Sequence, residues 1–431
     1  MQNNKQVRIW GKSEGITLEQ HIKDIYKAFY KLRSKVKDRE VRKCIKLAIK
    51  LHDLGKALPY FQIIMMRNKE YEPFSVYKNT YIYHSIASLL FINKEKLREI
   101  LDRKEDLANF VLSAVAYHHW NGSLERDMQA TEKYQALLKD INLLEKSLEN
   151  LKEELGQLFC DEEKSLLEID YHMLQGLARD LNVSEYAVPP YRMDWIPLRK
   201  DISQDMARKW VLISGFLMRC DHYASYCETA EDWNSKSEQE RSIELKKVEI
   251  DNIKYEDILN QVKRKVQDKA KRAVNLWQEE KIRGRIDKSI ILVAPTGSGK
   301  TEFAFLWSNG EKLIYTLPIR AIVEQTYERA KDIFGEERVG LLHGDADIYL
   351  LGEEQGSAQE YSDAPEQEKL IAQEKLRVYE LSKELSPAVI VSTGDQFFPY
   401  ALRPPGYERI YATLSYSRLV IDEVQAYDPV A

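Results

Sequence analysis

Cysteine, histidine and long apolar runs are all scarce in this sequence of 431 residues. The four cysteines, at positions 44, 160, 220 and 227, form no C-x-x-C pair, which argues against a disulfide framework and against a cysteine-ligated zinc site. No apolar run approaches the roughly 18 residues of a membrane-spanning helix, and the first residues lack the apolar stretch of a signal peptide. We therefore expect a cytoplasmic protein with reduced thiols and no membrane contact.

A strong net charge is also missing, because 64 Lys and Arg stand against 69 Asp and Glu, for a net charge of -5. This balance excludes a broadly basic nucleic-acid-binding surface, so any such contact must be a local basic groove. With 44% hydrophobic and 31% charged residues, the composition is that of a soluble globular protein. At roughly 150 residues per domain, the length predicts two or three domains.

The N-terminal half has the pattern of an all-α domain. Apolar residues recur at helical spacing from about residue 15 to Tyr226. Between Leu137 and Leu158 they alternate four and three apart, which predicts a helical hairpin near residues 130–160. An intermolecular coiled coil is the alternative interpretation of the same seam. We expect this domain to cover residues 1–235, followed by a helical connection over 236–280.

The remainder, residues 281–431, has the pattern of an α/β lobe. Short β-rich runs at 289–294, 312–316, 388–392 and 417–421 alternate with helical patterns such as 321–334, which predicts a parallel sheet. The Glu- and Gln-rich stretch 351–385 is expected to be a helical or mobile insertion with a solvated acidic face.

A set of histidines and carboxylates in the first domain predicts a metal centre. Five of the eight histidines contribute to it, and mixed nitrogen and oxygen donors without thiolate favour Mn, Fe, Co or Ni over structural zinc. Two such ions could activate water and stabilise a leaving oxygen in phosphoester hydrolysis. The predicted metal ligands are His21, His52, Asp53, His84, His118, His119 and Asp221.

The doublet His52 and Asp53 is the expected catalytic centre of this site. Lys56, three residues after Asp53, either neutralises phosphate charge or is a solvated helix residue, and the sequence leaves both interpretations open. His172 and His222 match no part of the pattern, so we expect them to be structural or exposed.

The second half carries a phosphate-binding loop, A-P-T-G-S-G-K-T, between an apolar run and a helical pattern. Its glycines allow backbone N–H groups to approach the phosphates of ATP, Lys300 supplies a charge, and Thr301 offers a hydroxyl to Mg. Asp422 and Glu423 follow the apolar run 417–421, where they suit Mg binding and polarisation of the attacking water. The predicted cofactor-binding residues are Pro295, Thr296, Gly297, Ser298, Gly299, Lys300, Thr301, Asp422 and Glu423, with Glu423 also catalytic.

Three further segments, 316–326, 343–345 and 392–398, resemble the superfamily 2 helicase segments that hold one nucleic-acid strand. Such contacts address phosphate and sugar and do not read the bases. The predicted contact residues are Arg320, Gln325, Thr393 and Gln396. The alternative is that these segments are ordinary turns at strand ends.

The order His, His-Asp, His, His-His, Asp, followed by the phosphate-binding loop and D-E-V-Q, resembles the type I CRISPR-associated nuclease-helicase family, whose own motif reads D-E-V-H. The resemblance implies an HD-type metal-dependent nuclease domain fused to an incomplete RecA-like lobe. It also implies single-stranded DNA as substrate, ATP as cofactor and recruitment to a Cascade-like CRISPR surveillance complex in antiviral defence.

The sequence stops shortly after the acidic pair, so a second helicase lobe is not part of it. We therefore expect metal-dependent cleavage of single-stranded DNA with little ATPase activity and no unwinding by this chain alone. Two alternatives stay open. One is an HD phosphohydrolase of small nucleotides with a regulatory ATP-binding lobe, and the other is a non-enzymatic, ATP-gated DNA-binding adaptor.

Overall fold

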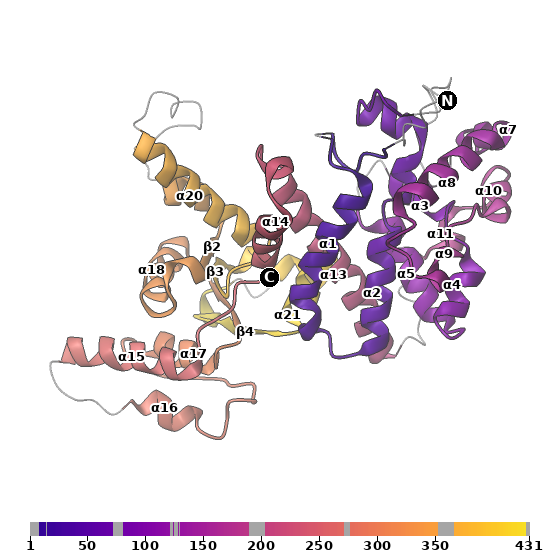
Figure 1. The fold of residues 1–431 in the computed structure, drawn as a ribbon. Helices are drawn as coiled ribbons and strands as arrows, with labels where there is room; N and C mark the ends of the chain where they lie inside the picture. The colour runs from indigo at the N-terminus through magenta and orange to yellow at the C-terminus, as the bar shows by residue number, and fades with distance from the viewer. Residues whose placement is uncertain are drawn as a thin grey trace. The chain divides into compact units, whose positions relative to one another are not determined.

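The computed structural model describes residues 8–13, 15–71, 81–120, 124, 128, 130–188, 203–270, 276–351 and 366–427. The chain forms two compact units (Figure 1). The first comprises residues 1–246 and 403–412, and the second comprises residues 247–402 and 413–431. The stretch 236–280, which we expected to be a connection, is divided between the two. Among the described helices, none is both long and apolar enough to cross a membrane.

The first unit is helical, as the apolar periodicity predicts. Its helices are α1 (Leu18–Leu32), α2 (Arg39–Leu51), α3 (His84–Leu89), α4 (Lys94–Ile100), α5 (Glu105–Tyr117), α7 (Thr131–Lys139), α8 (Ile141–Leu155), α9 (Asp161–Lys164), α10 (Tyr171–Leu177), α11 (Val183–Tyr186), α13 (Gln204–Glu228) and α14 (Glu238–Leu245). The central group is α1, α2, α5 and α13, with α3 packed on α5 and on the short 3-10 helix η2 (Leu54–Ala57). This group carries every predicted metal residue.

Local sequence explains where these helices begin. The side chain of Thr17 accepts a hydrogen bond from the backbone of Gln20, and that of Asp38 accepts from Glu40 and Val41. Each side chain satisfies N–H groups that the first turn of a helix leaves unpaired. α1 and α2 then bury one apolar face each, so the residues on that face meet α13.

The apolar seam predicted between Leu137 and Leu158 folds within the chain. It breaks near Asp140 into α7 and α8, which pack on each other, and α8 also contacts α1 and η2. Leu144, Leu151 and Leu155 are fully buried by these contacts. The seam therefore packs against other helices of the first unit, and the helical hairpin near residues 130–160 stays a prediction.

The second unit is an α/β lobe with a four-stranded parallel sheet of order β2-β3-β1-β4. Its elements are α15 (Tyr255–Ala270), α16 (Trp277–Ile282), α17 (Lys300–Trp307), β1 (Lys312–Leu317), α18 (Arg320–Phe334), β2 (Val339–Leu342), α19 (Ala346–Leu351), α20 (Glu366–Lys383), β3 (Val389–Thr393) and β4 (Ser417–Ile421). One last helix, α21 (Tyr407–Leu414), spans the boundary between the units.

Register in the sheet is set by a central apolar strand. Ile314 of β1 lies opposite Ile390 of β3 on one side and Leu419 of β4 on the other. Every residue of β1, β2 and β3 is buried, as in sheets whose two faces are covered. Because the strands are parallel, their carboxyl ends lie at one edge of the sheet, where Thr393 and Asp422 are found.

Two sequence expectations for this lobe need correction. The run 289–294 is not a strand, since it joins no ladder of the sheet, although Ile290 and Leu292 pack on the core. Its other face is open, with Ile291 96% and Val293 93% exposed. Conversely, β2 was not predicted, because four residues that include Gly340 give too short a periodic signal. Most of the second half of the expected insertion 351–385 forms the helix α20 (Glu366–Lys383), and residues 352–365 lie outside the described residues.

Candidate metal centre and nucleotide site

The seven predicted metal residues lie together in the first unit, although they span 200 positions of sequence from His21 to Asp221. Nitrogen and carboxylate atoms within 4.8 Å of one another form overlapping groups. The groups that these residues make among themselves are His21, His52 and Asp53; His52, His118 and Asp221; and His84, His118 and His119. Because His52 and His118 each belong to two of these groups, the three groups form one continuous cluster.

Asp53 is the hub of this cluster. Its Oδ2 lies 3.2 Å from Nε2 of His52 and 3.4 Å from Nε2 of His21, and its Oδ1 lies 3.3 Å from Nε2 of His84. On the opposite side, Oδ1 of Asp221 lies 3.3 Å from Nε2 of His21. Apart from His84 at 8% exposure, these side chains are at least 98% buried.

Three of the histidines are oriented by hydrogen bonds on their outer nitrogen, Nδ1. Nδ1 of His52 lies 2.8 Å from the carbonyl of Ile49, and Nδ1 of His118 lies 2.7 Å from the carbonyl of Val115. A carbonyl only accepts, so each Nδ1 carries the proton and each Nε2 presents a lone pair to the cluster. His21 Nδ1 is bound in the same way by Glu228, at 2.8 Å.

Most of the inward-facing atoms make no hydrogen bonds. Nε2 of His21, His52, His84 and His118, Oδ1 of Asp53 and Oδ2 of Asp221 are buried without a hydrogen-bond partner, whereas Oδ2 of Asp53 is ion-paired with Lys56. Leaving so many buried polar atoms unsatisfied would be costly in a folded protein unless an ion bound them. The donor set therefore fits divalent transition metal ions, which imidazole and carboxylate bind together.

The charge states within the cluster also suit a cation. Although burial opposes ionisation, His52 and Lys56 hold the pKa of Asp53 well below its usual range. Burial lowers the pKa of His84 and His119 well below the ordinary value, so both rings are neutral. Burial also opposes protonation of His21, but Glu228, Asp221 and Asp53 raise its pKa to about 10. Metal binding at His21 therefore competes with a proton.

Lys56 is neither a solvated helix residue nor exposed to the pocket. It is 4% exposed, its Nζ lies 2.5 Å from Oδ2 of Asp53, and it donates to the carbonyl of Gly11 at 2.9 Å. In this position the ammonium group fixes the Asp53 carboxylate and keeps it ionised.

Three residues around the cluster carry no sequence signal. Glu228 binds His21, and Ser225 lies beside Asp221, with Oγ to Oδ1 at 3.4 Å. His222 falls in a group with His119 and Asp221 and lines the adjoining cavity. The only available signal is its position next to Asp221.

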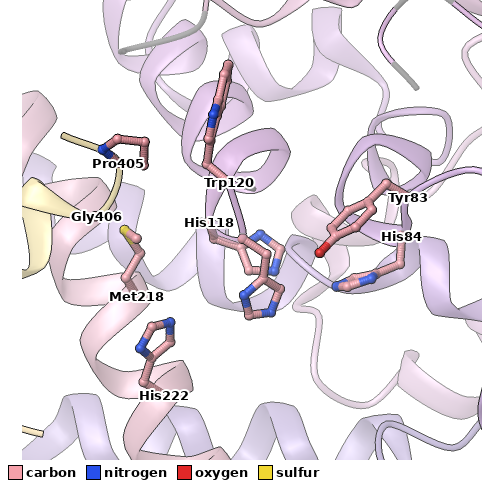
Figure 2. Close-up of a pocket in the computed structure, with 9 residues that line it drawn as sticks. Tyr83, His84, His118, Trp120, Met218, His222, Pro405 and Gly406 are labelled. Atoms are coloured by element: carbon pink, nitrogen blue, oxygen red, sulfur yellow. The ribbon is translucent and has the colours of Figure 1, made fainter. Parts of the chain in front are cut away.

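A cavity of about 480 Å³ opens beside the cluster, and all of its lining residues belong to the first unit. Figure 2 shows the residues that line it, among them His84, His118 and His222, the aromatic side chains Tyr83 and Trp120, and Pro405 and Gly406 on a further side. The histidines at the back of the cavity are thus accessible to a ligand, flanked by two aromatic side chains.

The phosphate-binding loop of the second unit leads into α17. Gly297 and Gly299 have positive φ angles of 77° and 91°, which favour glycine. Nζ of Lys300 lies 3.4 Å from the carbonyl of Ala294 and 3.5 Å from Oε1 of Glu423. The same loop contains the other predicted cofactor residues, which are Pro295, Thr296, Ser298 and Thr301.

The acidic pair is next to the loop. Asp422 accepts a hydrogen bond from the hydroxyl of Tyr315 at 2.6 Å, which with burial keeps the pKa of Tyr315 well above its usual value. Trp277 and Gln278, missed in the sequence, donate to the carbonyl of Ser298. A Cβ at Gly299 would lie 2.3 Å from Nε2 of Gln278, the end of a flexible side chain, so it is the positive φ angle of Gly299 that favours glycine here.

The four predicted nucleic-acid contacts differ in exposure. Arg320 is exposed and ion-paired with Asp345, and Gln325 is exposed on α18. Thr393 is 5% exposed at the end of β3, and Gln396 is half-buried and donates to Asp395 at 2.9 Å.

Comparison with known proteins finds a different family model in each of the two units. Residues 15–230 match the family model described as Cas3, HD domain. The chain belongs to the Cas3 family. Residues 264–429 match the DEAD/DEAH box helicase model, so this Cas3 family member is an HD domain joined to a helicase domain.

Relatives with curated names cover only parts of the chain. The CRISPR-associated nuclease/helicase Cas3 of Methanothermobacter thermautotrophicus is 33% identical over 147 residues, which are 33% of this chain and 16% of that protein. The putative CRISPR-associated nuclease/helicase Cas3 of Methanocaldococcus jannaschii is 41% identical over 71 residues, 15% of this chain and 10% of that protein. A crystal structure of T. fusca Cas3 with AMPPNP shares the fold, with a TM-score of 0.53 at 16% identity, over 98% of this chain and 47% of that one. The chain thus spans less than half of that protein.

Proposed function

We propose that the first unit is a metal-dependent nuclease that cleaves single-stranded DNA at the His52 and Asp53 cluster. The observation that carries the proposal is the convergence of buried nitrogen and oxygen atoms that make no hydrogen bond. His21, His52, Asp53, His84, His118, His119 and Asp221 would hold divalent ions of Mn, Fe, Co or Ni. Such ions supply activation of water and stabilisation of charge on a phosphodiester.

The chain's own residues prepare this chemistry. Backbone carbonyls and Glu228 turn the imidazoles so that Nε2 faces inward, and Lys56 keeps Asp53 in place and ionised. Tyr83 and Trp120 on the rim of the cavity suit stacking of unpaired bases, which duplex DNA does not offer. A single strand is therefore the substrate that fits this rim.

We propose further that the second unit binds ATP and Mg. Lys300 and Thr301 would contact the phosphates and Mg, Asp422 would hold Mg, and Glu423 would polarise the attacking water. In the family's context, Arg320, Gln325, Thr393 and Gln396 would hold a DNA backbone, and a CRISPR surveillance complex of the Cascade type would deliver the DNA in antiviral defence. The relatives' printed names support the CRISPR association.

The deciding experiment incubates labelled single-stranded DNA with the wild-type chain and with the His52→Ala/Asp53→Ala variant, in separate Mn, Fe, Co, Ni and Zn solutions. We expect cleavage by the wild type with at least one ion and none by the variant with any ion. Free nucleotides in a parallel panel test the phosphohydrolase alternative. Turnover of nucleotides without cleavage of DNA would overturn the nuclease proposal.

A further inference from the structure

Tyr315 is a buried tyrosine that contacts both parts of the candidate nucleotide site. It belongs to the central strand β1, where it lies opposite Val391 of β3 and Val420 of β4, and it is 1% exposed. A hydroxyl buried in this way needs a hydrogen-bond partner, because leaving it unpaired costs free energy. Its partner is not a backbone carbonyl but the carboxylate of Asp422.

The ring of Tyr315 packs on the helix that follows the phosphate-binding loop. Phe305 of α17 meets it edge-on, with ring centroids 5.9 Å apart and planes at 64°. Phe305 in turn contacts Phe334 of α18, and all three side chains are at most 1% exposed, so the ring of Tyr315 has a fixed direction. Burial raises the pKa of Tyr315, and the side chain of Thr301 acts in the opposite direction, as a hydroxyl that donates to the phenol oxygen does.

The hydroxyl of Tyr315 orients the carboxylate of Asp422. It donates to Oδ2 at 2.6 Å, while Oδ1 accepts from the backbone N–H of Glu423 at 2.8 Å. The backbone of Asp422 is fixed as well, since its N–H donates to the carbonyl of Thr316 at 3.0 Å. Each carboxylate oxygen carries two lone pairs, so an oxygen that accepts one of these hydrogen bonds keeps a lone pair for a cation or its water. The carboxylate is therefore oriented without being blocked.

We propose that Tyr315 is a positioning residue of the ATP site, which keeps Asp422 and Thr301 in place as a pair of Mg ligands. Side chains that bind metal ions commonly depend on a hydrogen-bonded neighbour of this kind. Lys300 supplies its charge with or without Mg, so loss of the phenol should act on the Mg-dependent part of ATP binding. The inference rests on the proposed binding of ATP and Mg by the second unit, and adds to it a residue outside the loop and the acidic pair.

The test measures ATP binding by the full chain in EDTA and at increasing Mg concentration. The anisotropy of ATP labelled on its ribose with a methylanthraniloyl group is recorded against protein concentration for Tyr315→Phe, Asp422→Asn and the double variant. Tyr327→Phe is the matched control, because Tyr327 is a 2% exposed tyrosine of α18 whose ring centroid lies 5.2 Å from Nζ of Lys331. Lys300→Ala identifies the signal that depends on the loop, and thermal unfolding verifies the folding of each variant.

We expect Tyr315→Phe to bind ATP in EDTA within about twofold of the wild type, but to need about 10-fold more Mg for half of the Mg-dependent gain in affinity. Asp422→Asn should lose most of that gain. Tyr315→Phe added to Asp422→Asn should cause no further loss, because the phenol acts through the carboxylate. Tyr327→Phe should match the wild type at every Mg concentration.

An unchanged Mg requirement in folded Tyr315→Phe protein would overturn the inference. Equal losses of affinity in EDTA and in Mg, or additive losses in the double variant, would also overturn it, because the phenol would then support the fold and not the ion. If Tyr315→Phe does not fold, Phe305→Leu replaces it, since it keeps the hydroxyl but removes the ring that fixes its direction, and the same outcomes decide. Failure of the proposed function looks different: the wild type itself would show no Lys300-dependent binding of ATP, and the inference would fall with it.

Discussion

At the scale of single residues, the proposed metal centre would depend on hydrogen bonds made on the outer side of three imidazoles. His52 and His118 use backbone carbonyls three residues earlier, so helical geometry alone supplies their partners. His21 instead needs a carboxylate 207 positions away, Glu228. This difference makes Glu228 the vulnerable partner, because a side chain can be replaced and a carbonyl cannot.

We expect Glu228→Gln to weaken Mn binding about 10- to 100-fold, since carboxylates that orient metal-ligating histidines typically contribute this much to affinity. Isothermal titration calorimetry of the metal-free chain measures the effect. Glu231→Gln, an exposed change three residues further on, is the control. Equal Mn affinity in both variants would show that His21 does not need its carboxylate partner.

Asp24, on the buried face of α1, gives a prediction about pH. Its carboxyl accepts from Gln20 at 2.7 Å and from Trp233 at 3.2 Å, but burial and the nearby Glu228 raise its pKa to about 6. The folded chain therefore holds this proton more tightly than the unfolded chain, whose carboxyl has a pKa near 3.8. The stabilising contribution of the protonated group is complete below about pH 4 and is lost as the pH rises through 6.

Asn mimics the protonated carboxyl, so Asp24→Asn should leave stability at pH 4 unchanged. At pH 8 it should raise the free energy of unfolding by on the order of 3 kcal/mol, at about 1.4 kcal/mol per pH unit between the two pKa values. Urea unfolding at both pH values measures this. The exposed Asp180→Asn should change neither value, and equal stabilisation by Asp24→Asn at pH 4 and pH 8 would contradict the assignment.

At the scale of elements, the turn after α2 carries the His-Asp doublet and must lie against α3. Ser88 of α3 donates to the carbonyl of His52 and accepts from the N–H of Gly55. A Cβ at Gly55 would lie 2.0 Å from the carbonyl oxygen of His84. Gly55 thus sets the distance between the doublet and His84.

Gly55→Ala should separate η2 from α3 and lower the affinity for metal, with a loss of stability of roughly 1–3 kcal/mol from overpacking. Mass spectrometry of bound Mn and urea unfolding report the two effects. At Gly344 a Cβ would meet only the end of the flexible Arg320 side chain, at 3.0 Å, so Gly344→Ala is the matched control. Full Mn occupancy and unchanged stability in Gly55→Ala would refute this role.

The helices and strands also show which parts of the fold can be predicted from the sequence. The helices of the first unit, the strands β1, β3 and β4 and the seven clustered metal residues followed from periodicity and motifs. The run 289–294 has strand-like alternation, but a strand also needs a hydrogen-bonded neighbour, which periodicity does not reveal. Glu228 was missed because its contact with His21 spans 207 positions of sequence.

At the scale of the whole molecule, the two units should respond separately to their ligands. Because metal would bind only the folded first unit, Mn at 100 times its dissociation constant should stabilise that unit by about 2.7 kcal/mol. Differential scanning calorimetry should show one transition moving with Mn and returning on addition of a chelator. The His52→Ala/Asp53→Ala variant should show no such movement, and a shift of equal size in that variant would place the ion elsewhere.

The open face of the 289–294 segment has a consequence for handling the protein in solution. Ile291 and Val293 leave apolar side chains uncovered, and so do Leu419 and Ile421 of the edge strand β4, which are 37% and 46% exposed. Extended backbone of this kind is a template for cross-molecule pairing. We expect light scattering by the purified chain to grow with concentration and time, and an Ile291→Thr/Val293→Thr variant to remain clear under conditions that cloud the wild type.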